Sequence, residues 1–380
     1  MSRNTVEVFY RFLALGCVSF GGPAAHLGYF HKAFVQKLQW LDEAGYARLI
    51  ALSQFLPGPG SSQVGFALGL RRAGLLGGVA AFVGFTLPSF VLLYLLAVGV
   101  FDYASGSTFD GVIQGLKLFA VVVVADASYS MFKSFCSEKR AITIAVVTAV
   151  TLLIIPSLIT QMLVLLLAAA VGIFIGKQST AHTAHGKISY LPLVLFFLLL
   201  LGLPFIAGYS QWLGMANDFY YSGSFVFGGG HVVLPLLQQT LGDTVATDRF
   251  LLGYAAAQAV PGPMFTLATF LGAEMSPVAP WIGAFVATLA IFLPGFLLVL
   301  GLQDSWESLA AKPRISGAVW GINAAVVGLL ISALYQPVFV SAVDSSLAMA
   351  AAITGFFALR SLKLPILLLI LAFALFGVVT

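Results

Sequence analysis

The sequence predicts an all-α integral membrane protein built from two inverted repeats, and three observations lead to this prediction. Hydrophobic residues make up 60% of the 380 residues and charged residues only 8%, whereas a soluble domain carries about 25% charged residues. Apolar stretches of membrane-spanning length recur along the chain. Three short motifs return in the same order in the second half. The composition excludes a soluble globular enzyme and a disordered chain.

Nine apolar stretches are candidates for full membrane spans, each of which needs about 20 helical residues to cross about 30 Å of hydrocarbon. They lie at 74–101, 111–134, 140–156, 159–176, 190–208, 278–302, 315–336, 345–358 and 362–379. Stretches 140–156, 159–176 and 345–358 are short for this purpose.

Four further apolar stretches are interrupted by glycine and proline, which end helices. The interruptions are Gly21-Gly22-Pro23 within 8–38, Pro57-Gly58-Pro59-Gly60 within 46–70, Gly228-Gly229-Gly230 within 213–242, and Pro261-Gly262-Pro263 within 249–273. These stretches are expected to form broken helices.

The motifs around the interruptions reveal an internal duplication. Phe20-Gly21-Gly22 returns as Phe227-Gly228-Gly229, Gln54 with Pro57-Gly58-Pro59 returns as Gln258 with Pro261-Gly262-Pro263, and Leu87-Pro88-Ser89-Phe90 returns as Leu293-Pro294-Gly295-Phe296. The offset stays between 204 and 207 residues. The predicted organisation is a first repeat over 1–176, a linker with a connecting transmembrane helix over 177–213, and a second repeat over 214–380.

Basic residues predict the orientation, because short cytoplasmic loops are enriched in Lys and Arg. One side carries Arg71/Arg72, Lys133/Lys139/Arg140, Lys177/Lys187, Lys312/Arg314 and Arg360/Lys363, and the other carries Asp102/Asp110, the uncharged 157–160 turn and Asp344. The N-terminus is therefore expected in the cytoplasm and the C-terminus outside. The single connector near 190–208 makes the second repeat enter from the opposite face, an arrangement common in secondary transporters.

Each broken stretch either crosses the membrane fully or dips to the midplane and returns. Full crossing places Lys32, Lys37 and Arg48 outside, whereas re-entry keeps them in the cytoplasm and collects Asp243 and Asp248 outside. We favour re-entry. Half-helices of about 11 to 15 residues rise about 16 to 22 Å, enough to reach the midplane. Irregular backbone at that depth occurs only where it is buried in protein or lines a cavity.

The interruptions point to an anion site, because a half-helix that starts after a break presents unpaired N–H groups with partial positive charge. Four such starts are expected to meet near the midplane, and an oxyanion with several acceptor oxygens matches them. The candidate substrate-binding residues are Gly21, Gly22, His26, Gln54, Gly58, Gly60, Ser61, Ser62, Gln63, Lys117, Gly229, Gly230, His231, Gln258, Gly262, Thr266 and Asn323.

Simpler roles compete with each of these. Gly-Pro pairs kink membrane helices and let them pack closely. Histidines such as His26 and His231 often bond a backbone carbonyl, and Ser and Thr in apolar helices often bond their own backbone. Ser61 and Ser62 stand out because they follow a break directly.

Two ionisable residues, Lys117 and Asp126, lie inside the span 111–134 and each needs a partner or a wet cavity. They are nine positions apart, too far for direct contact on one helix. The repeat offset pairs Lys117 with Asn323 and Asp126 with Ser332. Lys117 either snorkels to the interface or binds the anion, and Asp126 is either a proton-coupling group or a structural carboxylate.

Other chemistry has little support in the sequence. There is no HExxH, CxxC, GxSxG or GxxxxGK[ST] motif, so neither ATP coupling nor a hydrolytic site is encoded, and no cofactor or metal is expected. Cys17 and Cys136 are the only cysteines and sit in apolar surroundings. The net charge of +4 forms no basic patch, so no nucleic-acid partner is expected.

The glycine- and proline-rich motifs resemble the signature of the chromate ion transporter family. These are Phe20-Gly21-Gly22-Pro23, the run from Gln54 to Gly60, and the second copies at Phe227–Gly230 and Gln258–Pro263. The second copy has Gly230 in place of Pro23 and Met264 in place of Gly60. The resemblance covers nearly the whole chain as a two-repeat, long-chain member.

The resemblance implies a multi-pass protein of the bacterial inner membrane that exports chromate, an analogue of sulfate, and confers chromate resistance. Its expected partners are chromate or a sulfate-like oxyanion and the lipid bilayer, with a homodimer as a further possibility. Alternative functions are a sulfate or oxyanion importer, an anion channel and, in another class, an intramembrane enzyme or a lipid scramblase.

Overall fold

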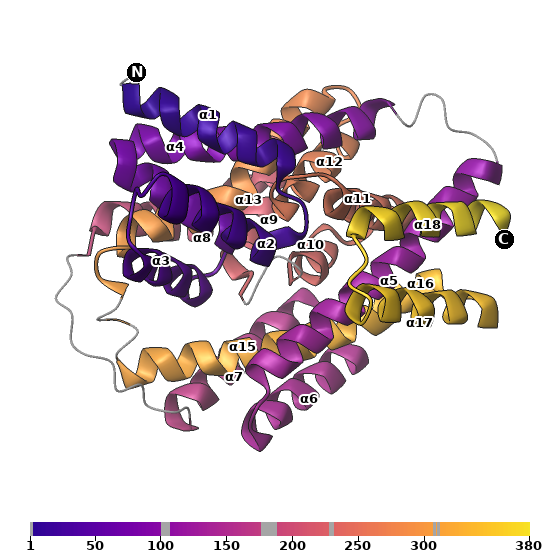
Figure 1. Cartoon of the computed structure of the whole chain (residues 1–380). Coiled ribbons are helices and arrows are strands. Elements are labelled where there is room, and N and C mark those ends of the chain that lie inside the picture. The colour runs from indigo at the N-terminus through magenta and orange to yellow at the C-terminus, as the bar shows by residue number, and fades with distance from the viewer. Residues whose placement is uncertain (1–2, 100–106, 176–187, 228–231, 307–308, 310–311) are drawn as a thin grey trace. The chain divides into compact units, whose positions relative to one another are not determined.

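The chain is helical throughout the part that a computed structural model describes, residues 3–99, 107–175, 188–227, 232–306, 309 and 312–380. No strand occurs within these ranges, which confirms the all-α fold class. Figure 1 labels the helices along the chain.

Six helical segments within the described ranges are long and apolar enough to cross a membrane: Gly60–Gly99, Asp110–Phe135, Leu158–Ile175, Tyr190–Tyr209, Pro280–Leu302 and Pro313–Ala342. They correspond to six of the nine predicted spans. The other three form shorter helices, α6 (Lys139–Ile154), α17 (Ser346–Arg360) and α18 (Ile366–Val379), of 16, 15 and 14 residues. At about 1.5 Å per residue these rise about 21 to 24 Å, less than the hydrocarbon thickness.

Helices stop at all four predicted interruptions. The flanking elements are α1 (Arg3–Val18) and α2 (Gly22–Phe30) with η1 (His31–Lys37); α3 (Glu43–Phe55) and α4 (Gly60–Gly99); α9 (Gln211–Phe225) and α10 (Val233–Leu241); and, after η4 (Gly242–Thr244), α11 (Thr247–Ala259) and η5 (Met264–Thr266) with α12 (Leu267–Glu274). Helix α4 is itself two helices, because Ala73 and Gly74 leave the helical conformation. The second half has the same division between α12 and α13 (Pro280–Leu302).

The chain forms two compact units, and each contains segments of both predicted repeats. Unit 1 comprises residues 1–100, 184–233 and 256–307, and unit 2 comprises residues 101–183, 234–255 and 308–380. The repeat boundaries at 176 and 214 therefore do not separate the compact units.

Unit 1 contains the predicted interruptions. Helix α1 packs along α4, and α9 packs along α13 in the corresponding way. Helix α8 (Tyr190–Ile206), continued by η2 (Ala207–Tyr209), contacts α9 and α13. Its outer face is apolar and exposed, with Phe205 83% exposed, as expected for a helix that faces lipid. Aromatic rings of Phe12, Phe30 and Phe85 fill the core beside α1.

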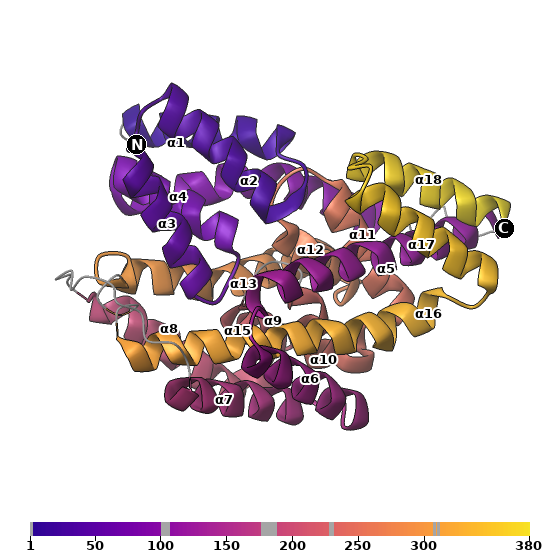
Figure 2. The same ribbon diagram turned by 60° about the horizontal axis from the view of Figure 1, so that its bottom comes forward.

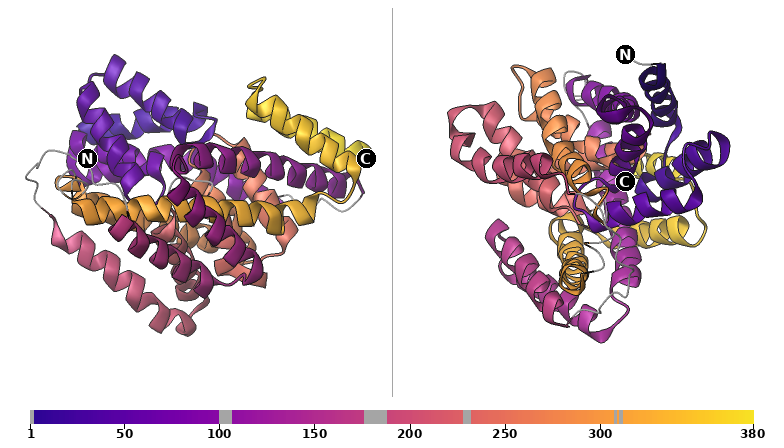
Figure 3. Two further views of the ribbon diagram at one scale, coloured as in Figure 1. Left: turned by 90° about the horizontal axis from the view of Figure 1, so that it is seen from below. Right: turned by 90° about the vertical axis from the view of Figure 1, so that its left-hand side faces the viewer.

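In unit 2, helices of one predicted repeat pack against helices of the other. Helix α5 (Ser107–Phe135) packs against α17 and α18 of the second repeat, as Figure 2 shows on its right-hand side. Helix α15 (Pro313–Ala333), followed by η6 (Leu334–Phe339) and α16 (Val340–Ala342), packs against α6 and α7 (Leu158–Ile175) of the first repeat, and Figure 3 gives two further views of these pairs. Glycines make the closest approaches, as in the pairs Gly111–Gly377 and Gly172–Gly317.

Paired glycines also hold each half-helix against the span that follows it. A Cβ on Gly69 would overlap the carbonyl of Gly77, and a Cβ on Gly272 would overlap the carbonyl of Gly283. Gly77 and Gly283 are equivalent within the repeat offset, and Gly272 lies one position before the equivalent of Gly69.

We predict that Gly69→Ala and Gly272→Ala each destabilise the protein by about 1 to 3 kcal/mol, because the added methyl group forces two backbones apart. Thermal unfolding of detergent-purified variants measures the effect. Gly202→Ala is the matched control, since a Cβ at Gly202 in α8 meets no atom within 4 Å. Equal melting temperatures for Gly69→Ala and Gly202→Ala would contradict the predicted close packing.

Candidate functional site

The interruptions of the two repeats are hydrogen-bonded to each other within unit 1. The amide of Gly58 donates to the carbonyl of Val226 at 2.7 Å, and the amide of Gly262 donates to the carbonyl of Ser19 at 3.0 Å. Gly58 corresponds to Gly262, and Ser19 corresponds to Val226, within the repeat offset of 204 to 207 residues. Each Pro-Gly-Pro loop is therefore held by the glycine-rich interruption of the other repeat.

Glycine is required at the centre of both loops. Gly58 and Gly262 have φ values of 118° and 109°, a region that side chains with a Cβ rarely adopt. A Cβ on Gly58 would lie 3.1 Å from Cα of Gly295, and a Cβ on Gly262 would lie 2.8 Å from Oγ of Ser89. Ser89 and Gly295 are themselves equivalent in the repeats, so each loop presses on the same point of the opposite long helix.

His26 fixes the start of one half-helix. Its side chain is fully buried, with Nε2 3.2 Å from the carbonyl oxygen of Ser19 and Nδ1 3.2 Å from Oγ of Ser61. A neutral ring satisfies both contacts, because Nε2–H donates to the carbonyl while Nδ1 accepts from the hydroxyl. The carbonyl of Ser19 thus serves both His26 and Gly262.

Ser61 and Ser62, two of the candidate substrate-binding residues, lie at the start of α4 and differ in their hydrogen bonds. Ser61 and Ser62 are 4% and 3% exposed. Ser61 contacts His26, whereas the hydroxyl of Ser62 is buried without a hydrogen-bond partner among the residues that the structure describes. Such a group costs free energy unless a ligand or water satisfies it.

Gln63 supports the loop. Its amide Nε2 donates to the carbonyl of Pro57 at 2.8 Å and lies 3.4 Å from the carbonyl of Gly295. Within the described part of the chain, its Oε1 is buried without a partner. Its donors therefore brace the Pro57–Gly60 turn, and its oxygen is an acceptor that suits a proton-bearing ligand.

The second repeat engages its polar groups differently. Thr266 Oγ1 donates to the carbonyl of Pro263 at 2.6 Å, and Gln258 Nε2 lies 3.1 Å from Sδ of Met264. Gln54, the counterpart of Gln258, is exposed, as is Gly21, while Gly22 and Gly60 are partly exposed. Gly229, Gly230 and His231 lie outside the described residues.

Unit 2 supplies the predicted charged residues with partners. Lys117, whose side chain is 11% exposed, forms an ion pair with Asp248 at 2.5 Å. Its counterpart Asn323 is buried, and the Oδ1 atom of Asn323 has no partner in the described ranges. The sequence had placed Asp248 among the outer loop residues, and its pairing with Lys117 follows only from the packing.

Asp126 is bound by Arg360, which the sequence had marked only as a cytoplasmic loop residue. Nη1 of Arg360 donates to Oδ1 of Asp126 at 3.0 Å and to Oγ of Ser130 at 2.8 Å. The guanidinium also lies 4.4 Å from the centre of the Tyr129 ring. Asp126 therefore has a fixed counter-charge.

The Lys117–Asp248 pair bears on how the second repeat enters the membrane. Lys117 lies seven positions after Asp110, about 10 Å along the helix. Re-entry puts Asp248 on the same side as Asp110, whereas full crossing puts it on the opposite side. The ion pair supports re-entry.

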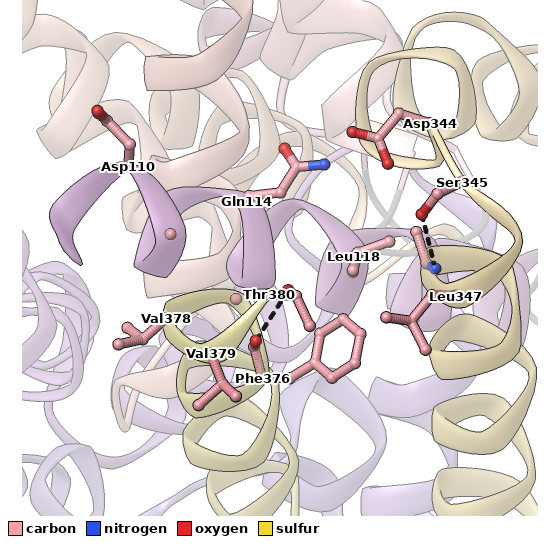
Figure 4. Close-up of a pocket in the computed structure, with 13 residues that line it drawn as sticks. Asp110, Gln114, Leu118, Asp344, Ser345, Leu347, Phe376, Val378, Val379 and Thr380 are labelled. Carbon is pink, nitrogen blue, oxygen red and sulfur yellow. Dashed lines mark hydrogen bonds between the residues drawn. The ribbon is translucent and has the colours of Figure 1, made fainter. Parts of the chain in front are cut away.

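A cavity of about 790 Å³ in unit 2 carries carboxylates. Asp110 on α5 and Asp344 before α17 lie on its wall together with Gln114, whose amide donates to the carbonyl of Ala342 (Figure 4). Its negative charge disfavours an anion. Among the described residues, no group of three or more His, Cys, Asp or Glu side chains is placed to hold a metal.

Long apolar helices together with interlocked interruptions define a polytopic membrane protein of transporter type. A protein-family model described as "Chromate transporter" matches residues 6–173 and again residues 213–378. The chain belongs to the chromate transporter family, which confirms the resemblance inferred from its motifs.

Proteins named as chromate transporters are similar to this chain over most of their length. A probable chromate transport protein of Synechococcus elongatus is 29% identical over 332 residues, covering 85% of this chain and 82% of the relative. A chromate transport protein of Cupriavidus metallidurans is 27% identical, covering 97% and 91%. One of Pseudomonas aeruginosa is 27% identical, covering 85% and 79%. No solved structure matches the chain.

We predict that single cysteines at Gln39 and Arg71 are labelled only from the cytoplasm, and that cysteines at Thr244 and Val278 are labelled only from outside. The native Cys17 and Cys136 are first replaced by serine. All four positions are exposed, so a failure to label reflects sidedness. Impermeant thiol reagents on intact cells and on inverted vesicles measure it. Labelling of Gln39→Cys from outside would replace re-entry with full crossing.

Proposed function

We propose that this protein is a secondary transporter that exports chromate, or a related tetrahedral oxyanion, across the bacterial inner membrane and thereby confers chromate resistance. Membership of the chromate transporter family and the names of the three relatives support the substrate class. The absence of an ATP-binding motif from the sequence favours coupling to an ion or proton gradient.

The buried hydroxyl of Ser62 carries this proposal. It sits in the first turn of a helix that begins directly after the Pro57–Gly60 loop, where backbone N–H groups have no intrahelical partner. A hydroxyl donor beside such amides suits an acceptor-rich anion. Ser61 and His26 position this turn, and the loops around Gly58 and Gly262 hold the two repeats together at the same place.

Helix starts supply only part of the charge that a dianion needs, since each offers about half an elementary charge. Lys117, with Asn323 as its neutral counterpart, is proposed to bind the anion on its path through unit 2, and the exposed Asp248 then acts as the alternative partner of Lys117 when no substrate is bound. His231 is a second candidate. Asp126, which is paired with Arg360, is proposed to couple a proton.

The proposed topology has a cytoplasmic N-terminus, an outer C-terminus and re-entrant half-helices in two inverted repeats at 1–176 and 214–380. Because the repeats are inverted, they enter the membrane from opposite sides. Equivalent groups of the two repeats therefore reach the membrane midplane from both faces.

Flux into proteoliposomes tests the function. We expect uptake of chromate, measured with and without an imposed pH gradient, and inhibition by sulfate. Ser62→Ala should lower the apparent affinity by about tenfold, because a buried donor to charge is worth about 1 to 3 kcal/mol. Ser134→Ala is the control, since Ser134 is exposed and bonds only the carbonyl of Ser130. Absence of chromate flux from correctly inserted protein would refute the proposal, and flux without gradient coupling would indicate a channel.

A further inference from the structure

Unit 2 contains a second cavity, of about 340 Å³, that neither the sequence motifs nor the interruptions involve. It lies where the end of α6, helix α10, the start of α11 and the α15–η6 junction meet. Its volume far exceeds the roughly 10 to 15 Å³ that one water molecule requires. A small polyatomic ligand fits within it.

The described residues on the wall of this cavity include polar side chains but no charged ones. Its polar side chains are three amides and two hydroxyls, namely Gln238, Gln239, Gln336, Ser332 and Thr247. The remaining lining residues are apolar side chains and a glycine. Amides and hydroxyls donate hydrogen bonds, and none of the described residues on this wall carries a carboxylate that would repel an anion. The Asp110 and Asp344 cavity has the opposite character.

Two groups on the wall lack the partners that buried polar atoms normally have. Ser332 is only 8% exposed and makes no hydrogen bond with the described residues. Oε1 of Gln239, an acceptor, is buried without a partner among the described residues. The Ser332 hydroxyl is an unmet donor on this wall, which indicates that something other than the described protein groups satisfies it.

The cavity beside Ser332 occupies a position equivalent to that of the Asp126–Arg360 ion pair. A shift of 206 residues relates Ser332 to Asp126, Gln336 to Ser130, and Ile154 to Arg360. Arg360 of the second repeat bonds both Asp126 and Ser130 of the first repeat through its guanidinium. The equivalent of Arg360 beside Ser332 is Ile154 of the first repeat, which is 72% exposed and is not among the described residues that line the cavity. The position equivalent to the Asp126–Arg360 ion pair therefore has a hydroxyl in place of the carboxylate and an isoleucine in place of the arginine.

We propose that this cavity is a second oxyanion site, in which Ser332 and the amides of Gln238, Gln239 and Gln336 bind a tetrahedral dianion through neutral donors. The proposal rests on the proposed function for its choice of ligand. Neutral donors bind such an anion without a fixed ion pair, which suits a site that substrate enters and leaves. Asp126 and Ser332 occupy equivalent positions but differ in charge. The position of Asp126 is then closed by its ion pair with Arg360, and the position of Ser332 is open to substrate.

Protection from labelling tests binding at this site directly. Ser332→Cys is made in protein with Cys17 and Cys136 replaced by serine, and its modification by an anionic methanethiosulfonate is timed in detergent. Sulfate is the probe, because it does not oxidise thiols. We expect sulfate to slow the modification several-fold relative to chloride at equal ionic strength. Thr143→Cys, at an exposed position of α6, should react at the same rate in both salts. Equal rates for Ser332→Cys in the two salts would overturn the inference.

A charge substitution provides the second measurement. Ser332→Asp introduces the carboxylate of the first repeat and should reduce sulfate binding and chromate flux at least about tenfold through like-charge repulsion. Ser332→Asn, which has nearly the same shape without charge, should bind and transport far better. Equal binding by both variants would contradict the site, and monodisperse elution of both shows that they are folded.

These outcomes separate the site from the proposed function. Protection by sulfate in a protein without chromate flux would leave the oxyanion site standing and refute chromate transport. Normal chromate flux without protection, and with Ser332→Asp as active as wild type, would leave the transport function standing and refute the site.

Discussion

Two crossed backbone hydrogen bonds, from Gly58 to Val226 and from Gly262 to Ser19, are the interaction on which the rest of the candidate site depends. Each fixes a Pro-Gly-Pro loop against the interruption of the other repeat, and each uses a glycine with positive φ. The carbonyl of Ser19 also accepts from His26, which in turn orients Ser61. The N–H groups at the start of a helix have no intrahelical partner, and leaving them unpaired in an apolar surrounding costs free energy. The hydrogen bonds of the loops hold this helix start in one place.

In unit 2, Lys117 and Asp126 each form an ion pair. Lys117 with Asp248 and Asp126 with Arg360 each join a residue inside a predicted span to a residue near a helix end of the second half. Pairing lowers the cost of a charge within a helix bundle, and it leaves a partly exposed partner that another ligand can replace.

The sequence predicted the helical fold and the four interruptions because glycine and proline act locally on the backbone, and it predicted the repeat because motifs at Phe20, Pro57 and Leu87 recur at one offset. It did not predict that the amide of Gln63 braces Pro57, that Ser61 bonds His26, or that Arg360 bonds Asp126. Those partners lie 6, 35 and 234 positions apart, and helix packing alone brings the last two together. Three of the nine predicted spans form short helices, since hydropathy does not define where a helix ends.

Chromate flux through Gly58→Ala and Gly262→Ala in proteoliposomes, at equal amounts of monodisperse protein, tests the interlocked interruptions most directly. The two glycines lie in different repeats but occupy equivalent loops, and a methyl group at either strains the backbone and presses on Gly295 or Ser89. The account predicts that each substitution lowers flux strongly and to a similar extent, while Gly202→Ala transports like the wild type. Wild-type flux from either loop variant would contradict it.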